Sequence, residues 1–160
     1  MMECSCGRKC LEFIGPEDSD ILIVSDAPED DDYKKGMIFT GQRGQILASE
    51  LARVGIQMSR IRLACFYLHA PADDCAGHFN EALKEMKNKK GVLIVGASAV
   101  ERMQLGKLSD MVGTCVDNFY VPRSTGFVMV TTQPPANDLL GEFRLSVEKF
   151  SKKIKEVKRD

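Results

Sequence analysis

The sequence lacks the features that define several large classes of protein. No apolar stretch reaches the roughly 18 residues that a membrane-spanning helix needs, and the first residues, Met1 to Cys4, show no basic-then-apolar signal-peptide pattern. An excess of one charge is also missing, because 22 Lys and Arg residues face 23 Asp and Glu residues. We therefore expect a cytoplasmic protein without membrane contacts, in which any contact with nucleic acid comes from a local basic face.

Internal repeats and low-complexity linkers are absent as well, so the 160 residues are predicted to form one domain, residues 1–160. Hydrophobic residues make up 44% of the chain and charged residues 28%, which is typical of a globular protein and excludes intrinsic disorder. Within this domain, residues 1–19 look like a separate cysteine-containing segment, and residues 139–160 are expected to form a C-terminal helix.

Apolar runs bounded by turn residues alternate with helical patterns along the chain. The expected strands are residues 21–24, 61–68, 92–95, 119–121 and 127–132, and the expected helices are residues 45–54, 77–89, 98–103 and 139–160. Residues 29–36 are expected to be a polar loop, whose acidic run at 29–32 has no cation-loop spacing and is predicted to be solvated. Strands that are apolar throughout and alternate with helices indicate an α/β fold with a parallel sheet covered on both faces.

Ligands of such folds bind at the carboxyl ends of the strands, where this sequence has few polar residues. Asp26 follows the first strand, and its carboxylate could orient a water molecule or stabilise a developing cation, or it could simply cap its own turn. Phe39 lies among glycines, where its ring could stack on a planar ligand or belong to the core. His69 closes the second strand, and a chain with two histidines offers few candidates for His-based chemistry.

The six cysteines, in a chain without an export signal, indicate a reducing compartment and therefore free thiols or metal ligands. Cys4, Cys6 and Cys10 could supply three thiolates to zinc or to an iron–sulfur cluster. A fourth ligand would come from Cys75, His78 or His69. The spacing matches no strong metal motif, and reduced thiols near a frayed terminus are the simpler interpretation.

Four segments follow one another in an order that is typical of one family. They are residues 23–28 (Ile-Val-Ser-Asp-Ala-Pro), 36–47 (Gly-Met-Ile-Phe-Thr-Gly-Gln-Arg-Gly-Gln-Ile-Leu), 93–99 with Leu105-Gly106, and 132–136 (Thr-Gln-Pro-Pro-Ala). Together they resemble the motifs of the uracil-DNA glycosylase superfamily, especially the short microbial branch that often carries an iron–sulfur cluster. The second segment is the most specific, because it is similar to Gly-x-Pro-Phe-Val-Gly-x-Ala-Gly-x-Leu-Leu in that branch.

The resemblance implies a three-layer α/β/α sandwich with a short, mainly parallel central sheet, and an enzyme of base excision repair that hydrolyses the N-glycosidic bond of uracil or a related damaged base flipped out of DNA. Asp26 would stabilise the sugar cation, and Gln133 would donate a hydrogen bond to the leaving base. The residues implied to bind the base are Phe39, Cys65, Ala27 and Pro28. The residues implied to contact DNA are Gly41, Arg43, Ser98, Pro134, Pro135, Asn137 and Leu139, the last as a wedge in the minor groove.

Several positions depart from the family pattern, whose first motif is Gly-Glu-(Ala/Gly)-Pro-Gly. Asp26 stands in place of Glu, and Ser25 and Glu29 stand in place of two glycines. Cys65 occupies the position of the Asn that reads the edge of uracil, and Gln133 occupies that of a His. Because a thiol is a weak donor and acceptor, we expect slow excision and altered base specificity.

The metal ligands of the family are also incomplete here. His69 stands where the family has a cluster cysteine, so we expect no intact four-cysteine cluster and no cofactor, with Cys4, Cys6, Cys10 and Cys75 as the candidate ligands if a metal is bound. The implied partner is DNA that contains a damaged or deaminated base, bound by a monomer.

Two alternatives stay open at the level of sequence. The first is a catalytically silent member of the same fold that binds DNA or another protein through the same cleft. The second is a small-molecule enzyme of flavodoxin-like build, which would need a phosphate loop after the first strand, where residues 26–30 are too acidic for phosphate.

Overall fold

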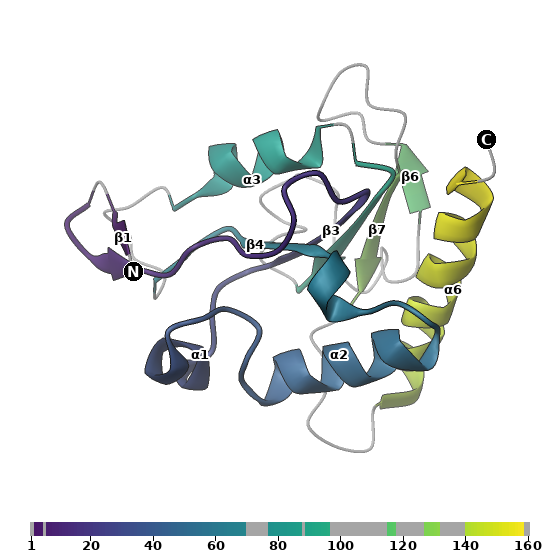
Figure 1. Ribbon diagram of the computed structural model, residues 1–160, viewed down its shortest axis with the longest axis horizontal. Coiled ribbons are helices and arrows are strands. Elements are labelled where there is room, and N and C mark those ends of the chain that lie inside the picture. The colour runs from purple at the N-terminus through teal and green to yellow at the C-terminus, as the bar shows by residue number, and fades with distance from the viewer. Residues whose placement is uncertain are drawn as a thin grey trace.

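The computed structural model describes residues 2–4, 6–69, 77–87, 89–96, 115–117, 127–131 and 140–158. Its centre is a five-stranded sheet with the order β4-β3-β5-β7-β6, with helices on both faces (Figure 1). The strands β3 (Ile21–Ser25), β4 (Arg62–Cys65), β5 (Gly91–Val95) and β7 (Phe127–Thr131) are parallel, and β6 (Cys115–Asp117) is antiparallel to β7. The predicted α/β/α sandwich is thereby confirmed.

The strands are apolar at most positions because both faces of the sheet are covered, and the polar exceptions are Ser25, Arg62, Asp117 and Thr131 at or near strand ends. In β3, Ile21 and Ile23 belong to one core cluster, whereas Leu22 and Val24 belong to the other. Successive side chains of a strand point to opposite faces, so two covered faces favour apolar residues at consecutive positions. The first cluster lies under α2 (Gln42–Arg53) and α6 (Leu140–Lys158), and the second lies under α3 (Phe79–Met86).

A charged network fixes α2 against α6. The carboxylate of Glu50, buried in α2, accepts hydrogen bonds from Arg144 Nε and Nη2, both at 2.9 Å, and from Arg53 Nε at 3.1 Å. The hydrogen bond from Arg144 lowers the pKa of Glu50, against the effect of its burial. Arg53 also donates to Glu148 on α6 at 2.7 Å, so the two helices share four ionised groups.

Several element boundaries differ from the sequence predictions. The second strand ends at Cys65 instead of Leu68, α2 begins at Gln42, and α3 is shorter at both ends than residues 77–89. The predicted strand at 119–121 and the predicted helix at 98–103 lie outside the described residues. None of the described helices is long and apolar enough to cross a membrane.

Two sequence predictions for the first third of the chain are wrong. Residues 29–36 are not a polar loop, because α1 (Asp30–Lys35) forms there and ends at Gly36, whose φ is 76°. The N-terminal segment is not frayed either. Its strands β1 (Met2–Glu3) and β2 (Lys9–Cys10) form a hairpin, Cys10 and Leu11 are buried in the core, and the Leu11 amide donates to the carbonyl of Leu68.

Candidate active site

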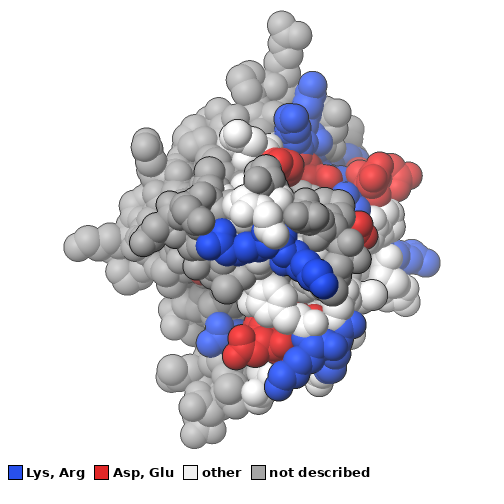
Figure 2. Space-filling view, turned by 90° about the vertical axis from the view of Figure 1, so that its left-hand side faces the viewer, with Lys and Arg blue, Asp and Glu red and all other residues white. Residues whose placement is uncertain are grey.

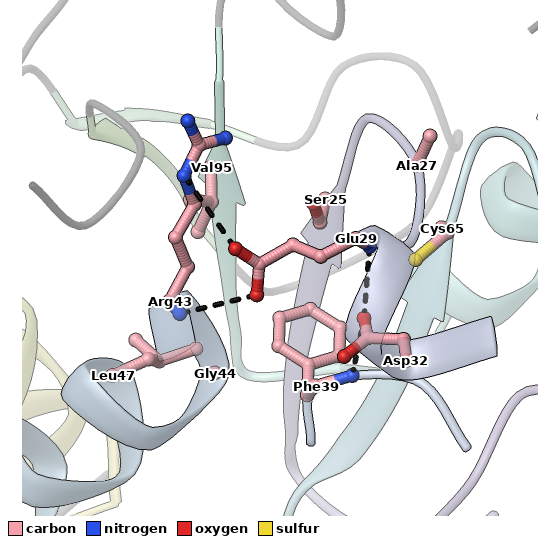
Figure 3. Close-up of a pocket in the computed structure, with 10 residues that line it drawn as sticks. All are labelled: Ser25, Ala27, Glu29, Asp32, Phe39, Arg43, Gly44, Leu47, Cys65 and Val95. Atoms are coloured by element: carbon pink, nitrogen blue, oxygen red, sulfur yellow. Dashed lines mark hydrogen bonds and ion pairs between the residues drawn. The ribbon is translucent and has the colours of Figure 1, made fainter. Parts of the chain in front are cut away.

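A small pocket lies at the carboxyl ends of three neighbouring strands, where ligands of parallel α/β sheets bind (Figure 3). It is lined by Ser25, Ala27, Glu29, Asp32, Phe39, Arg43, Gly44, Leu47, Cys65 and Val95. These residues come from the ends of β3, β4 and β5, from α1 and the segment before it, from the loop between α1 and α2, and from the first half of α2. The cavity volume is about 30 Å³, which is room for roughly two water molecules.

Asp32 is the structural centre of this pocket. Its carboxylate, 3% exposed, accepts four backbone N–H groups, those of Glu29 and Phe39 at 3.1 Å, of Thr40 at 3.0 Å and of Gly41 at 2.6 Å. The prediction of a solvated acidic run is therefore wrong for this residue, although Asp30 and Asp31 are exposed. A single buried carboxylate thus joins the start of α1 to the loop that follows it and to the start of α2.

The Phe39 loop, residues 37–41, is held in an unfavourable backbone conformation. Phe39 has φ of 61°, in the left-handed region, alone among the non-glycine residues that the structure describes. Such a conformation costs about 1–3 kcal/mol and persists only where the surroundings impose it. Here Asp32 binds three successive amides of the loop, and a Cβ on Gly44 would lie 2.2 Å from the Phe39 carbonyl oxygen. The half-buried ring is therefore fixed at the pocket.

An ion pair lies beside the ring. The Arg43 backbone N–H donates to Glu29 Oε2 at 3.1 Å, and Arg43 Nε is 3.7 Å from Glu29 Oε1. Figure 3 shows the Glu29 side chain stretched from the start of α1 toward Arg43 at the start of α2. The Arg43 side chain is 52% exposed, in contrast to the buried carboxylate of Asp32.

Cys65 forms the floor of the pocket at the end of β4, beside Ser25 of β3. Burial raises the pKa of its thiol, and the nearby carboxylates of Asp32 and Asp26 raise it further. The thiol is therefore neutral at physiological pH. A neutral thiol is a weak hydrogen-bond donor and a poor nucleophile, so this position offers little polar recognition.

Of the residues predicted from the sequence to form the site, the structure brings Ala27, Phe39, Arg43 and Cys65 together in the pocket. Gly41 precedes α2 and donates to Asp32. Asp26 and Pro28 adjoin the pocket in sequence but are not among the described residues that line it. Six predicted residues lie outside the described residues: Ser98, Gln133, Pro134, Pro135, Asn137 and Leu139.

Two charged residues of the pocket, Glu29 and Asp32, were not predicted from the sequence as site residues. Their spacing indicates a short capped helix. Glu29 and Asp32 are hydrogen-bond acceptors three residues apart at the start of α1, and Gly36 ends the helix. The negative charge of residues 29–32, taken alone, predicts only that these side chains are exposed to solvent. Figure 2 shows one face of the molecule, on which acidic and basic side chains lie next to one another among the coloured residues.

A second group of reactive side chains lies between the N-terminal hairpin and the segment that follows β4. The ligand atoms of Cys4, Cys6 and His69 are all within 4.8 Å of one another, and Cys6 Sγ is 3.5 Å from His69 Nε2. Cys10 is buried nearby, where burial raises its pKa and Cys4 and Cys6 add to the effect. Two thiols and one imidazole do not fit a cluster that takes four thiolates, and Cys75 lies outside the described residues.

Comparison with known proteins gives one match. A family model described as the uracil DNA glycosylase superfamily matches residues 12–154. No curated protein matches the chain. The matched range contains every residue that lines the pocket, whereas Cys4, Cys6 and Cys10 precede it.

Proposed function

Because the chain belongs to the uracil DNA glycosylase superfamily, we propose that its pocket slowly hydrolyses the N-glycosidic bond of uracil or a related damaged base in DNA. The observation that carries this proposal is the fixed position of Phe39, whose loop is held by a buried carboxylate at the carboxyl ends of the strands. A rigid aromatic ring at this place can stack on a base that has been flipped out of DNA.

The reaction needs negative charge near the sugar, because the bond breaks through a sugar with cationic character. In the proposed mechanism Asp26, which follows β3, stabilises this charge and orients the attacking water molecule. Glu29 adds a second carboxylate at the pocket. Gln133 is proposed to donate a hydrogen bond to the base as it leaves with negative charge, and the loss of one such donor costs roughly 10²–10³ in rate.

A base does not fit the pocket in this conformation, since the cavity holds only roughly two water molecules. Entry of a base therefore requires a side chain to move, and in this proposal the exposed Glu29–Arg43 pair opens. An exposed ion pair contributes only about 0–1 kcal/mol to stability, so opening it is a small cost compared with flipping the base, which takes a few kcal/mol.

The second candidate function is a catalytically silent member of the superfamily that binds DNA without cleaving it. The observation that favours it is the neutral, buried thiol of Cys65 on the pocket floor, at the position expected to read the base. Both candidates share the fixed Phe39 ring. They differ in whether any bond is broken, which only an activity measurement distinguishes.

The test is a single-turnover assay with excess protein and an end-labelled oligonucleotide that contains one uracil. We expect slow excision from single-stranded or mismatched DNA and little from a U·A pair, because unpaired bases flip at lower cost. Asp26→Asn should abolish the activity, and the matched change Asp31→Asn, at an exposed carboxylate, should not. Cys65→Asn and Gln133→His should each raise the rate. If the wild type and the double variant bind the oligonucleotide but excise nothing, the silent alternative is correct.

A further inference from the structure

We propose that Cys4, Cys6 and His69 bind a single zinc ion, which fastens the N-terminal hairpin to the segment after β4. This site is separate from the pocket, and its two thiols precede the range that the family model matches. The proposal does not depend on glycosidic chemistry.

The distances fit the geometry of zinc. A tetrahedral zinc with a Zn–S bond of about 2.3 Å and a Zn–N bond of about 2.0–2.1 Å separates the sulfur from the nitrogen by about 3.6 Å. Cys6 Sγ and His69 Nε2 are 3.5 Å apart. A thiol–imidazole hydrogen bond would account for this pair alone, whereas the third ligand atom, Cys4 Sγ, lies within 4.8 Å of both.

The backbone brings the two thiols to one side of a tight turn. The Gly7 amide donates to the Cys4 carbonyl and the Cys4 amide donates to the Arg8 carbonyl, both at 2.8 Å. Gly7 has φ of 89°, and nothing lies within 4 Å of the position of its missing Cβ, so the glycine is required there for its conformation and not for space. The turn is therefore built to present Cys4 and Cys6 together.

The histidine is brought to the turn by long-range contacts. The Leu11 amide donates to the carbonyl of Leu68 at 2.9 Å, which fixes the chain next to His69 against the hairpin. His69 is 3% exposed and Cys4 is 8% exposed, so the donors are largely shielded from water. His78 packs edge-on against His69 at 5.7 Å, but its Nδ1 accepts the Leu68 amide and is already in use.

The donor set favours zinc over an iron–sulfur cluster. Zinc accepts mixed sulfur and nitrogen ligands and completes its shell with water or a further donor. Iron–sulfur clusters take four protein ligands, either four cysteines or two cysteines and two histidines, and the group contains three such ligands among the described residues. Two thiolates also balance the charge of Zn²⁺, so the buried site is neutral when the ion is bound and both thiols have lost their protons. Soft thiolates and an imidazole do not suit Mg²⁺ or Ca²⁺.

The experiment measures the metal content of the full chain, purified without oxygen and without chelators. We expect about one zinc per chain by mass spectrometry, as the mononuclear site requires. Cys4→Ser, Cys6→Ser and His69→Gln should each weaken zinc binding by roughly 100-fold or more, whereas Cys65→Ser, at a buried cysteine outside the group, should keep the zinc. Iron with an equal amount of sulfide, or zinc binding that survives the Cys6 and His69 changes, would overturn the proposal.

Substitution of the ion keeps the proposal testable if a variant does not fold. The wild-type chain is stripped of metal and titrated with Co²⁺, whose absorption reports thiolate ligands through charge-transfer bands and tetrahedral geometry through visible bands. We expect both signatures, and their loss when zinc is added in equal amount. Cobalt that shows only the pale spectrum of an octahedral ion would exclude the site.

Discussion

Asp32→Asn tests whether one carboxylate holds the Phe39 loop. The carboxylate offers two oxygens to four backbone N–H groups, those of Glu29, Phe39, Thr40 and Gly41. Asparagine keeps the shape but offers one oxygen, and its amide NH₂ then faces the other two N–H groups. Each buried N–H group without an acceptor costs about 1–3 kcal/mol, so the direct loss is about 2–6 kcal/mol.

Part of this loss is recovered, because a released loop no longer has to keep Phe39 at its unfavourable φ of 61°. That conformation costs about 1–3 kcal/mol, so we expect a net destabilisation of about 1–3 kcal/mol. A domain of this size has a free energy of unfolding of about 5–15 kcal/mol, so the variant should still fold.

The assay is urea unfolding followed by circular dichroism, since the chain contains no tryptophan to report on the core. Asp31→Asn is the matched control, because it removes the same charge from an exposed position of the same helix and should change the stability by no more than about 0.5 kcal/mol. If Asp32→Asn and Asp31→Asn unfold at the same urea concentration, Asp32 does not hold the loop and the reasoning fails.

Three further predictions follow from the same contacts. Phe39→Gly should destabilise the protein less than Phe39→Ala, because a positive φ costs alanine about 1 kcal/mol and costs glycine nothing. Urea unfolding of both variants measures the difference. Arg43→Ala should raise the single-turnover excision rate by up to about 5-fold, which corresponds to the free energy of about 1 kcal/mol that a surface ion pair contributes at most. Arg60→Ala, outside the pocket, should leave the rate unchanged. Glu50→Gln should cost about 1–2 kcal/mol at pH 7. Because the folded pKa of Glu50 is lowered, its contribution is complete above about pH 4.3 and disappears as the pH falls through the folded value, so the wild type and Glu50→Gln should converge in acid unfolding.

The sheet could be predicted from the sequence because its signal is local. Runs such as residues 21–24 are apolar throughout, and covering both faces of a parallel sheet demands that pattern. The short helix α1 gives no such signal, since its residues Asp-Asp-Asp-Tyr-Lys-Lys have no apolar periodicity. Its stability comes from capping and from the amides that Asp32 binds beyond the helix, and a list of acidic residues does not show which one is buried.

The site could be predicted only in part, for the same reason. Cys65 is the last residue of β4, so its place at the carboxyl edge of the sheet follows from the parallel topology. Phe39 lies in the loop between α1 and α2, where the surrounding glycines indicate it as a candidate. The pairing of Glu29 with Arg43 depends on the turn that places α2 beside the end of β3, and the meeting of Cys6 with His69 depends on how the hairpin packs. Contacts of this kind need the tertiary structure.

The contacts that hold the Phe39 loop are separate from the groups that react in the proposed function. The ring is held by Asp32 and by the close approach of Gly44, and neither contact involves a group that reacts. A chain can therefore keep a stacking platform for a base after the residues that read its edge have changed. Rate, by contrast, depends on Asp26, Cys65 and Gln133, whose polar groups face the reacting atoms in the proposed mechanism. In the proposed mechanism, Asn at position 65 and His at position 133 act on the flipped base. The excision rate of that double variant, measured with protein in excess over DNA, therefore reports the catalytic capacity that the pocket retains.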